Sequence, residues 1–131
     1  MRNTSHSHAL QSPLSQVLEA VDIGVWEYDH VSDRMFWSPW LYALLGYDIG
    51  QAPSSLAAWL GLIHRDDLPG VQARIAAALT PENSLYEAEY RLRAADGQWR
   101  WFHARGRVMR WDAEGRPLFT AGVQLDNVSS G

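Results

Sequence analysis

Apolar residues recur with two different periods along the chain, a helical one in the first half and an alternating one in the second. Residues 1–11 follow neither period, and we predict a disordered leader there. Ser12 and Pro13 then form a helix-start signal, which predicts an amphipathic cap helix over residues 12–22. Its apolar stripe has to be buried, either on the domain's own sheet or on a second copy of the chain. The stripe consists of Leu14, Val17, Leu18 and Val21.

A β-hairpin and a helix follow the cap helix. Residues 24–29 and 35–37 are rich in β-forming side chains and enclose a polar turn, which predicts the hairpin. Ser38 and Pro39 repeat the helix-start signal, and Gly46 suits the left-handed position that ends a helix.

Two further helices are predicted before the period changes. Residues 54–60 predict a short helix closed by Gly61. Asp66 is the predicted N-cap of a longer helix, where its charge also suits the positive end of the helix dipole. The apolar side of that helix carries Val71, Ile75 and Leu79.

From Leu85 onward apolar and charged residues alternate, which is typical of half-buried strands. Strands are predicted over 85–93, 98–110 and 118–125, joined by turns at 96–97 and 112–115. These three strands form an antiparallel meander. A hairpin, short helices and a meander in this order predict an α+β domain with one antiparallel sheet and its helices on one face.

Composition narrows the function. The chain has no cysteine, which excludes disulfides, thiolate metal sites and flavin adducts through sulfur. Fifteen acidic against eleven basic residues give a net charge of −4, so neither nucleic acid nor an anionic membrane surface is an expected partner. We find no signal peptide and no apolar run long enough to span a bilayer, and we expect a cytoplasmic location.

Several motifs in a fixed order carry a family resemblance. They are G-x-W-x-Y-D at 24–29, S-P-x-L-Y-x-L-L-G-Y at 38–47, I-H-x-D-D at 63–67, E-Y-R-L-R at 89–93, D-G at 96–97 and A-R-G-R at 104–107, with Trp101, Gly122 and Asp126. By these motifs residues 14–128 resemble the PAS domain superfamily, specifically the bacterial branch with PAC-type C-terminal strands. That branch provides sensor modules of histidine kinases and cyclic-di-GMP enzymes.

The resemblance implies a PAS domain over 23–128, with a five-stranded antiparallel sheet of strand order 2-1-5-4-3 and helices that enclose a small cavity. It implies a sensory and dimerisation domain that regulates an effector in the same polypeptide, a histidine kinase or a diguanylate cyclase or phosphodiesterase. Residues 129–131 are then the start of a linker to that effector. Asp126 is the expected output residue, although Asn127 and Val128 replace the usual isoleucine and threonine.

The ligand-binding candidates cluster around Gln124. The last strand is similar to that of flavin-binding light-oxygen-voltage domains, where a glutamine faces the flavin. The alternative is that Gln124 satisfies a backbone group. Glycines there either leave room for a cavity or permit close helix packing, and the aromatic candidates are either pocket or plain core. The candidates are Trp26, Tyr28, Arg100, Phe102, Ala104, Thr120, Gly122 and Gln124.

The opposite face of the sheet is the expected interface. Alternation places Trp99, Trp101 and His103 there, and aromatic residues are the usual anchors of protein interfaces. Together with the stripe of the cap helix they predict a homodimer.

Two other functions compete with this interpretation. In a haem-based gas or redox sensor His64 would be the axial ligand, but in the plain alternative its imidazole holds the local backbone of a turn before a helix. An enzyme on a similar α+β fold needs a carboxylate base in an apolar pocket, and we find neither that nor a nucleophile beside a base. We therefore predict no catalytic residue and no metal site apart from His64 in the haem case. The expected cofactor is none or a small organic ligand.

Overall fold

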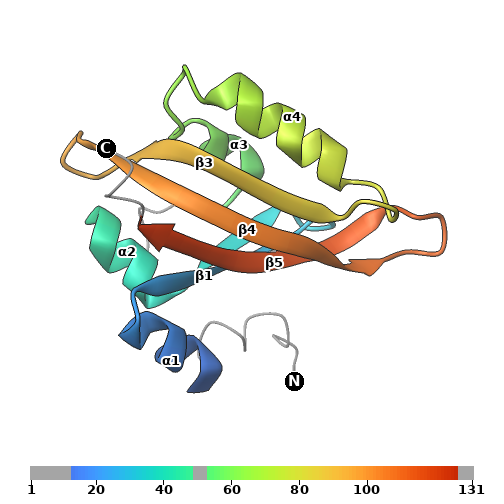
Figure 1. The fold of residues 1–131 in the computed structure, drawn as a ribbon, viewed down its shortest axis with the longest axis horizontal. Coiled ribbons are helices and arrows are strands. Elements are labelled where there is room, and N and C mark those ends of the chain that lie inside the picture. Colours follow the sequence, from blue (N-terminus) through green and yellow to red (C-terminus); the bar gives the residue numbers. More distant parts are fainter. Residues whose placement is uncertain (1–12, 49–52, 127–131) are drawn as a thin grey trace.

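The computed structural model describes residues 13–48 and 53–126, which form one antiparallel sheet with four helices (Figure 1). The strand order is β2-β1-β5-β4-β3, so the predicted α+β fold and strand order are confirmed. The predicted leader and linker lie outside the described residues. The strands are β1 (Ile23–Asp29), β2 (Arg34–Trp37), β3 (Leu85–Arg93), β4 (Trp99–Trp111) and β5 (Pro117–Asp126), and the helices are α1 (Pro13–Ala20), α2 (Pro39–Leu45), α3 (Leu56–Leu60) and α4 (Leu68–Ala78).

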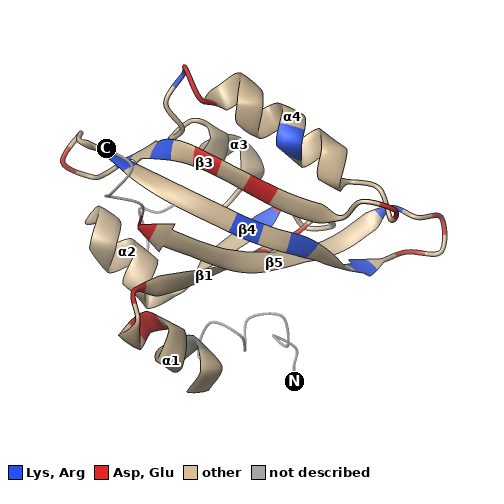
Figure 2. Ribbon diagram, viewed as in Figure 1, with Lys and Arg blue, Asp and Glu red and all other residues tan. Residues whose placement is uncertain are grey.

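The sheet has a buried face and a charged face, as the alternation along β3 predicts. The buried face and the helices enclose the core, in which Leu41, Leu92 and Phe102 have no exposed surface. On the charged face the acidic residues of β3 lie beside the arginines of β4 (Figure 2), and Glu87 is in register with Arg105. No helix within the described residues is long and apolar enough to cross a membrane.

α2 begins and ends where the sequence predicts, but Ser38, the residue before it, does not cap the helix. Gly46 ends the helix with φ of +79°, a conformation that glycine adopts without strain. Ser38 occupies the N-cap position, yet its hydroxyl makes no bond to α2. It accepts the backbone N–H of Val25 at 3.0 Å, while the Ser38 N–H donates to the Val25 carbonyl at 2.8 Å. Ser38 therefore extends the pairing of β2 with β1.

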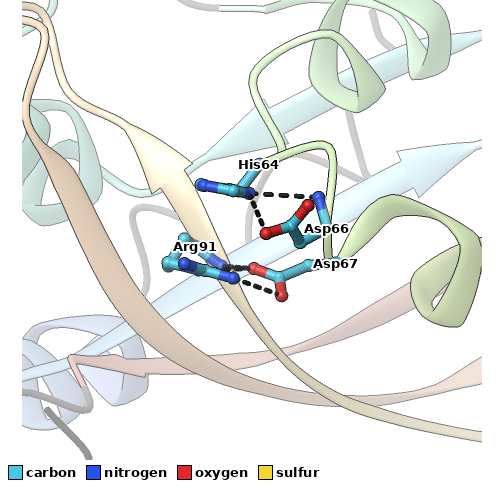
Figure 3. Close-up of polar contacts among 4 residues, drawn as sticks. All are labelled: His64, Asp66, Asp67 and Arg91. Carbon is cyan, nitrogen blue, oxygen red and sulfur yellow. Dashed lines mark hydrogen bonds and ion pairs between the residues drawn. The ribbon is translucent and has the colours of Figure 1, made fainter.

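The start of α4 differs from the prediction in a similar way. Asp67, and not Asp66, holds the N-cap position, and its carboxylate makes no cap bond. Its Oδ2 accepts from the Arg91 backbone N–H and from Nε, both at 2.9 Å, and its Oδ1 accepts from Nη2 at 3.0 Å (Figure 3). The His64 N–H also donates to the Arg91 carbonyl at 3.0 Å. These bonds cover the open edge of β3, which would otherwise present unpaired backbone groups.

We expect Asp67→Asn to lower the free energy of unfolding by about 1 kcal/mol at pH 7, because charge-assisted bonds to Arg91 are weakened in a partly solvated site. Arg91 lowers the pKa of Asp67 in the folded state. A lowered pKa stabilises the fold above the ordinary value of 3.8, and this stabilisation is lost as the pH falls through the folded pKa. Urea denaturation of both chains at pH 7 and pH 3 measures the stability lost in Asp67→Asn and shows whether that loss becomes smaller at low pH.

The neighbouring carboxylate supplies the control for this pair of measurements. Asp66 is mostly exposed, and Asp66→Asn should change stability by less than about 0.5 kcal/mol. An Asp67→Asn deficit that is equally large at pH 7 and pH 3 would contradict the role of the carboxylate charge.

Candidate functional site

A cavity of about 140 Å³ lies between the buried face of the sheet and helices α3 and α4. All five strands contribute to its lining. Six of the lining residues have large aromatic side chains: Trp26, Tyr28, Trp37, Trp59, Tyr86 and Tyr90. The polar lining residues are His30, Ser84, Thr120 and Gln124, and none of the described lining residues is Asp, Glu, Lys or Arg. Such an aromatic site with few polar groups is typical of a small-molecule pocket.

Trp26 owes its position to two glycines. Gly106 of β4 and Gly122 of β5 lie directly opposite each other, and Trp26 is in register with Gly122. A Cβ atom would lie 2.6 Å from the Trp26 ring at Gly106 and 2.7 Å from it at Gly122. The indole therefore rests on bare backbone, with its Nε1 donating to the Val123 carbonyl at 3.1 Å. It meets the Tyr86 ring edge to face, with centroids 6.0 Å apart.

Two lining residues of the cavity have a buried polar atom without a partner among the described residues. The Tyr90 hydroxyl donates to Gln124 Oε1 at 2.9 Å. The side-chain nitrogen of Gln124, a residue only 2% exposed, has no partner among the described residues, and the same holds for the Tyr86 hydroxyl. That hydroxyl approaches Tyr90 without the geometry of a hydrogen bond. Burial raises the pKa of Tyr86 and of Tyr90, so both hydroxyls keep their protons.

At the mouth of the cavity the polar groups already have partners. The Tyr28 hydroxyl donates to Asp33 Oδ1 at 2.6 Å, and the Leu56 N–H donates to the same oxygen at 3.1 Å. His30 Nε2 and Thr120 Oγ1 lie 2.6 Å apart, in hydrogen-bond contact. Burial lowers the pKa of His30, so its imidazole is neutral at pH 7. Tyr28, His30 and Thr120 therefore already have hydrogen-bond partners on this side of the cavity.

The sequence model of the family described as "PAS fold" matches residues 34–124. The chain belongs to the PAS-fold family. Its strand order and its cavity under the helices agree with this membership. No match was found among curated proteins.

Solved structures with the same fold come from signalling proteins. A sensory box histidine kinase/response regulator from Burkholderia thailandensis is 26% identical, with a TM-score of 0.75, and the match covers 91% of this chain and 87% of that one. The N-terminal domain of a diguanylate cyclase with a PAS/PAC sensor from Marinobacter aquaeolei is 22% identical, with a TM-score of 0.72, over 82% and 97%. An RNA-binding light-oxygen-voltage receptor is 22% identical, with a TM-score of 0.63, over 83% of this chain and 30% of that one.

The cavity of this PAS domain takes in half of the predicted ligand-binding residues. Trp26, Tyr28, Thr120 and Gln124 line it. Phe102, Ala104 and Gly122 share the same sheet face but do not line it. Phe102 and Ala104 are covered by other side chains of the core, and the Trp26 ring occupies the space above Gly122. The free space that was predicted beside Gly122 is thus occupied by a side chain of the domain itself, Trp26.

Arg100, the remaining candidate, lies away from the cavity and contacts the predicted output residue. Its Nη2 donates to Asp126 Oδ2 at 2.7 Å. Arg100 Nε and Asp126 Oδ1 are buried and have no partner within the described residues. Arg100 thus joins β4 to the end of β5, beside a second hollow lined by the end of α2 and the turn between β3 and β4.

The predicted interface residues lie on the face opposite the cavity or on α1. Trp99 packs on the His64 ring and Trp101 on the Arg91 guanidinium, both at 4.7 Å, and His103 Nε2 lies 2.8 Å from Glu87 Oε2. Leu18 is half-buried. Leu14, Val17 and Val21 remain 60–67% exposed, so α1, which packs beside β1 (Figure 1), leaves most of its stripe uncovered.

His64 does not fit the haem alternative. Its Nδ1 accepts the Asp66 N–H at 3.0 Å, its ring packs on Trp99, and it is not a lining residue of the cavity. His30 does line the cavity, but its Nε2 is engaged by Thr120. A volume of about 140 Å³ is also far smaller than haem or flavin requires. Within the described residues no three His, Asp or Glu side chains gather as a metal site.

Three buried residues escaped the sequence analysis. Tyr86 and Tyr90 line the cavity, and the alternation along β3 could have placed them beside the other candidates. Glu27 is only 1% exposed, on the face of the sheet opposite the cavity, and its Oε1 has no partner among the described residues. Burial raises the pKa of Glu27 to about 7. The sequence pattern does not reveal this burial, because Glu27 alternates with apolar residues of β1 as the charged residues of a solvated strand face do.

Proposed function

We propose that this PAS domain is a signal-input domain that takes up a small molecule in the aromatic cavity. The observation that carries the proposal is that two lining residues of the cavity, Gln124 and Tyr86, each have a buried polar group without a partner among the described residues. Buried polar groups normally have partners, and a bound molecule would supply them. The similarity to sensor domains of a histidine kinase and a diguanylate cyclase supports the same function.

The signal would leave through the end of β5. Gln124 faces the cavity, and Asp126 follows two residues later on the same strand. A ligand bonded to Gln124 would shift β5 relative to Arg100. This shift would change the contact between Arg100 and Asp126 at the end of the strand. We propose an effector in the same polypeptide, a histidine kinase or a diguanylate cyclase or phosphodiesterase, and a non-catalytic role for this domain. Glu27 is buried, but it lies on the far side of the sheet and cannot act as a base in the cavity.

Native mass spectrometry of the purified chain tests the uptake of a small molecule. We expect a mass excess that disappears on denaturation. Ala78, a buried lining residue of α4, can be enlarged to fill the cavity, and Ala78→Leu should abolish the mass excess. Ala77→Leu, on the exposed side of the same helix, is the matched control and should retain it. A native chain without any bound molecule would count against the proposal.

We also propose a homodimer through α1 and the charged face of the sheet. The exposed stripe of α1 supports it, since an apolar stripe usually meets a partner. We expect Val17→Glu to shift the chain to a monomer in light scattering, at the concentration at which the unmodified chain is a dimer. Val31→Glu, at an apolar residue 76% exposed in the turn between β1 and β2, should leave the dimer intact. A monomeric unmodified chain would refute the dimer.

A further inference from the structure

We propose that the ligand is an uncharged single-ring molecule with a carbonyl oxygen, which accepts hydrogen bonds from Gln124 Nε2 and the Tyr86 hydroxyl. This inference rests on the proposed function, because it names the chemical class of the molecule that the cavity takes up. Three features of the cavity carry it: its size, the absence of charge in its lining, and the placement of its unpartnered donors.

The size of the cavity limits the ligand to about one ring. Its volume is about 140 Å³, and a protein cavity of roughly 150 Å³ holds benzene. The aromatic wall favours a flat molecule, because edge and face contacts with Trp59, Tyr86 and Tyr90 are available there. A six-membered ring with one small substituent therefore matches the space.

The lining selects against charge. None of the described lining residues is acidic or basic, and the imidazole of His30 is neutral and bonded to Thr120. Asp33 lies at the mouth, where Tyr28 and Leu56 bond it. The charge of Arg74 on α4 interacts electrostatically with Tyr86, but Arg74 is exposed to solvent and does not line the cavity. An ion in the cavity would lose its hydration without gaining a buried counter-charge, which is strongly unfavourable.

The unpartnered donors set the polarity of the ligand. The side-chain nitrogen of Gln124 can only donate, and Tyr90 already occupies the oxygen of that amide. The hydroxyl of Tyr86 has a proton to donate as well. A carbonyl oxygen has two lone pairs and can accept from both groups, whereas an apolar ring would leave them unsatisfied.

The same placement orients the ligand. The donors belong to residues that are 2% and 6% exposed, whereas Leu79 is 37% exposed and Ser84 is half-buried, which marks the open side of the cavity. The carbonyl oxygen would therefore point inward and the ring toward the mouth. Substituents on the ring edge opposite the carbonyl should be tolerated, because they would extend toward solvent.

Three probes of nearly equal shape test this class: acetophenone carries a neutral carbonyl, isopropylbenzene has no acceptor, and benzoate is an anion. Each is titrated into the full chain and followed by tryptophan fluorescence and heteronuclear NMR, since Trp26, Trp37 and Trp59 line the cavity. We expect acetophenone to bind about 3- to 10-fold more tightly than isopropylbenzene, as one net hydrogen bond allows. Benzoate should bind at least about 10-fold more weakly than acetophenone.

Tyr86→Phe is the decisive variant, because it removes a hydroxyl that has no hydrogen-bond partner among the described residues and should leave the chain folded. The affinity for acetophenone should fall about 3- to 10-fold, and that for isopropylbenzene should not change. Tyr47→Phe is the matched control, since the Tyr47 hydroxyl donates to the Arg93 carbonyl outside the cavity. It should leave both affinities unchanged. Gln124→Leu combined with Tyr90→Phe removes the other donor without stranding the Tyr90 hydroxyl.

The outcomes separate this inference from the proposed function. Equal binding of acetophenone and isopropylbenzene, unaffected by Tyr86→Phe, would overturn the carbonyl and leave small-molecule uptake standing. Tighter binding of benzoate would overturn the neutral class in the same way. No binding of any probe, together with no bound molecule in the native chain, would overturn both.

Discussion

Replacement of Gly122 by alanine is expected to lower the free energy of unfolding by about 3 kcal/mol or more, at the upper end of the usual range for overpacking. A Cβ atom at Gly122 would collide with the Arg105 carbonyl oxygen and would lie 2.6 Å from the Gly106 Cα. These are backbone atoms of the neighbouring strand, so no side-chain rotation relieves the contact. For a domain of this size the midpoint of thermal unfolding should fall by about 10 °C.

A second glycine supplies the control for this substitution. Gly70 of α4 has no atom within 4 Å of its ideal Cβ position, so Gly70→Ala should leave the chain as stable or raise its stability by up to about 1 kcal/mol. At Gly106 the added methyl meets the Trp26 ring at 2.6 Å. The smaller ring of Trp26→Phe should therefore recover part of the stability lost in Gly106→Ala. A Gly122→Ala chain as stable as the unmodified one would refute the close approach of β4 and β5.

Replacement of Glu27 by glutamine is expected to stabilise the chain at pH 8. The pKa of Glu27 rises from 4.5 to about 7 in the folded state because of burial. A raised pKa means that the folded chain holds this proton between pH 4.5 and 7, where the unfolded chain has released it. The protonated Glu27 therefore contributes its full share to the stability of the folded chain below pH 4.5. The folded chain loses this contribution as the pH rises through 7 and the carboxyl ionises. Glutamine has the same shape and never ionises.

Denaturant unfolding at pH 4.5 and at pH 8 measures this effect. The pKa displacement corresponds to about 3–4 kcal/mol at about 1.4 kcal/mol per unit, and structural relaxation and water penetration around the buried carboxylate reduce the expected gain at pH 8 to about 1–2 kcal/mol. At pH 4.5 the gain should nearly disappear. Glu114→Gln, in an exposed turn, is the control and should change stability by less than about 0.5 kcal/mol at either pH. A destabilised Glu27→Gln at pH 8 would show that the Glu27 carboxylate is paired.

Much of the fold was predictable because its signals are local. Proline after Ser38 and glycine at position 46 mark the ends of α2, since each acts through its own backbone angles. The alternation along β3 and β4 separated the buried face from the charged face, because successive side chains of a strand point to opposite sides. The turn at Gly97, with φ of +88°, lies where the pattern places it.

Side chains that act across the fold were not predictable in this way. Ser38 and Asp66 were expected to act as local caps. Instead Ser38 bonds to β1, and Asp67, which holds the N-cap position of α4 in place of Asp66, bonds to β3; both strands lie elsewhere in the chain. A capping residue and a residue that bonds a distant strand have the same local pattern. The burial of Glu27 likewise depends on which residues cover β1, and the sequence of β1 itself does not show which residues these are.

The sequence by itself determined the elements, their order, the buried face of the sheet and, through the motifs, the PAS-fold family. Only the tertiary structure decided which residues of that face line a cavity. Gln124, Phe102 and Gly122 share one face, yet Gln124 alone of the three borders the cavity. The reason is that a void remains where side chains from separate elements fail to fill the space, and Trp26 fills it above Gly122 but not beside Gln124.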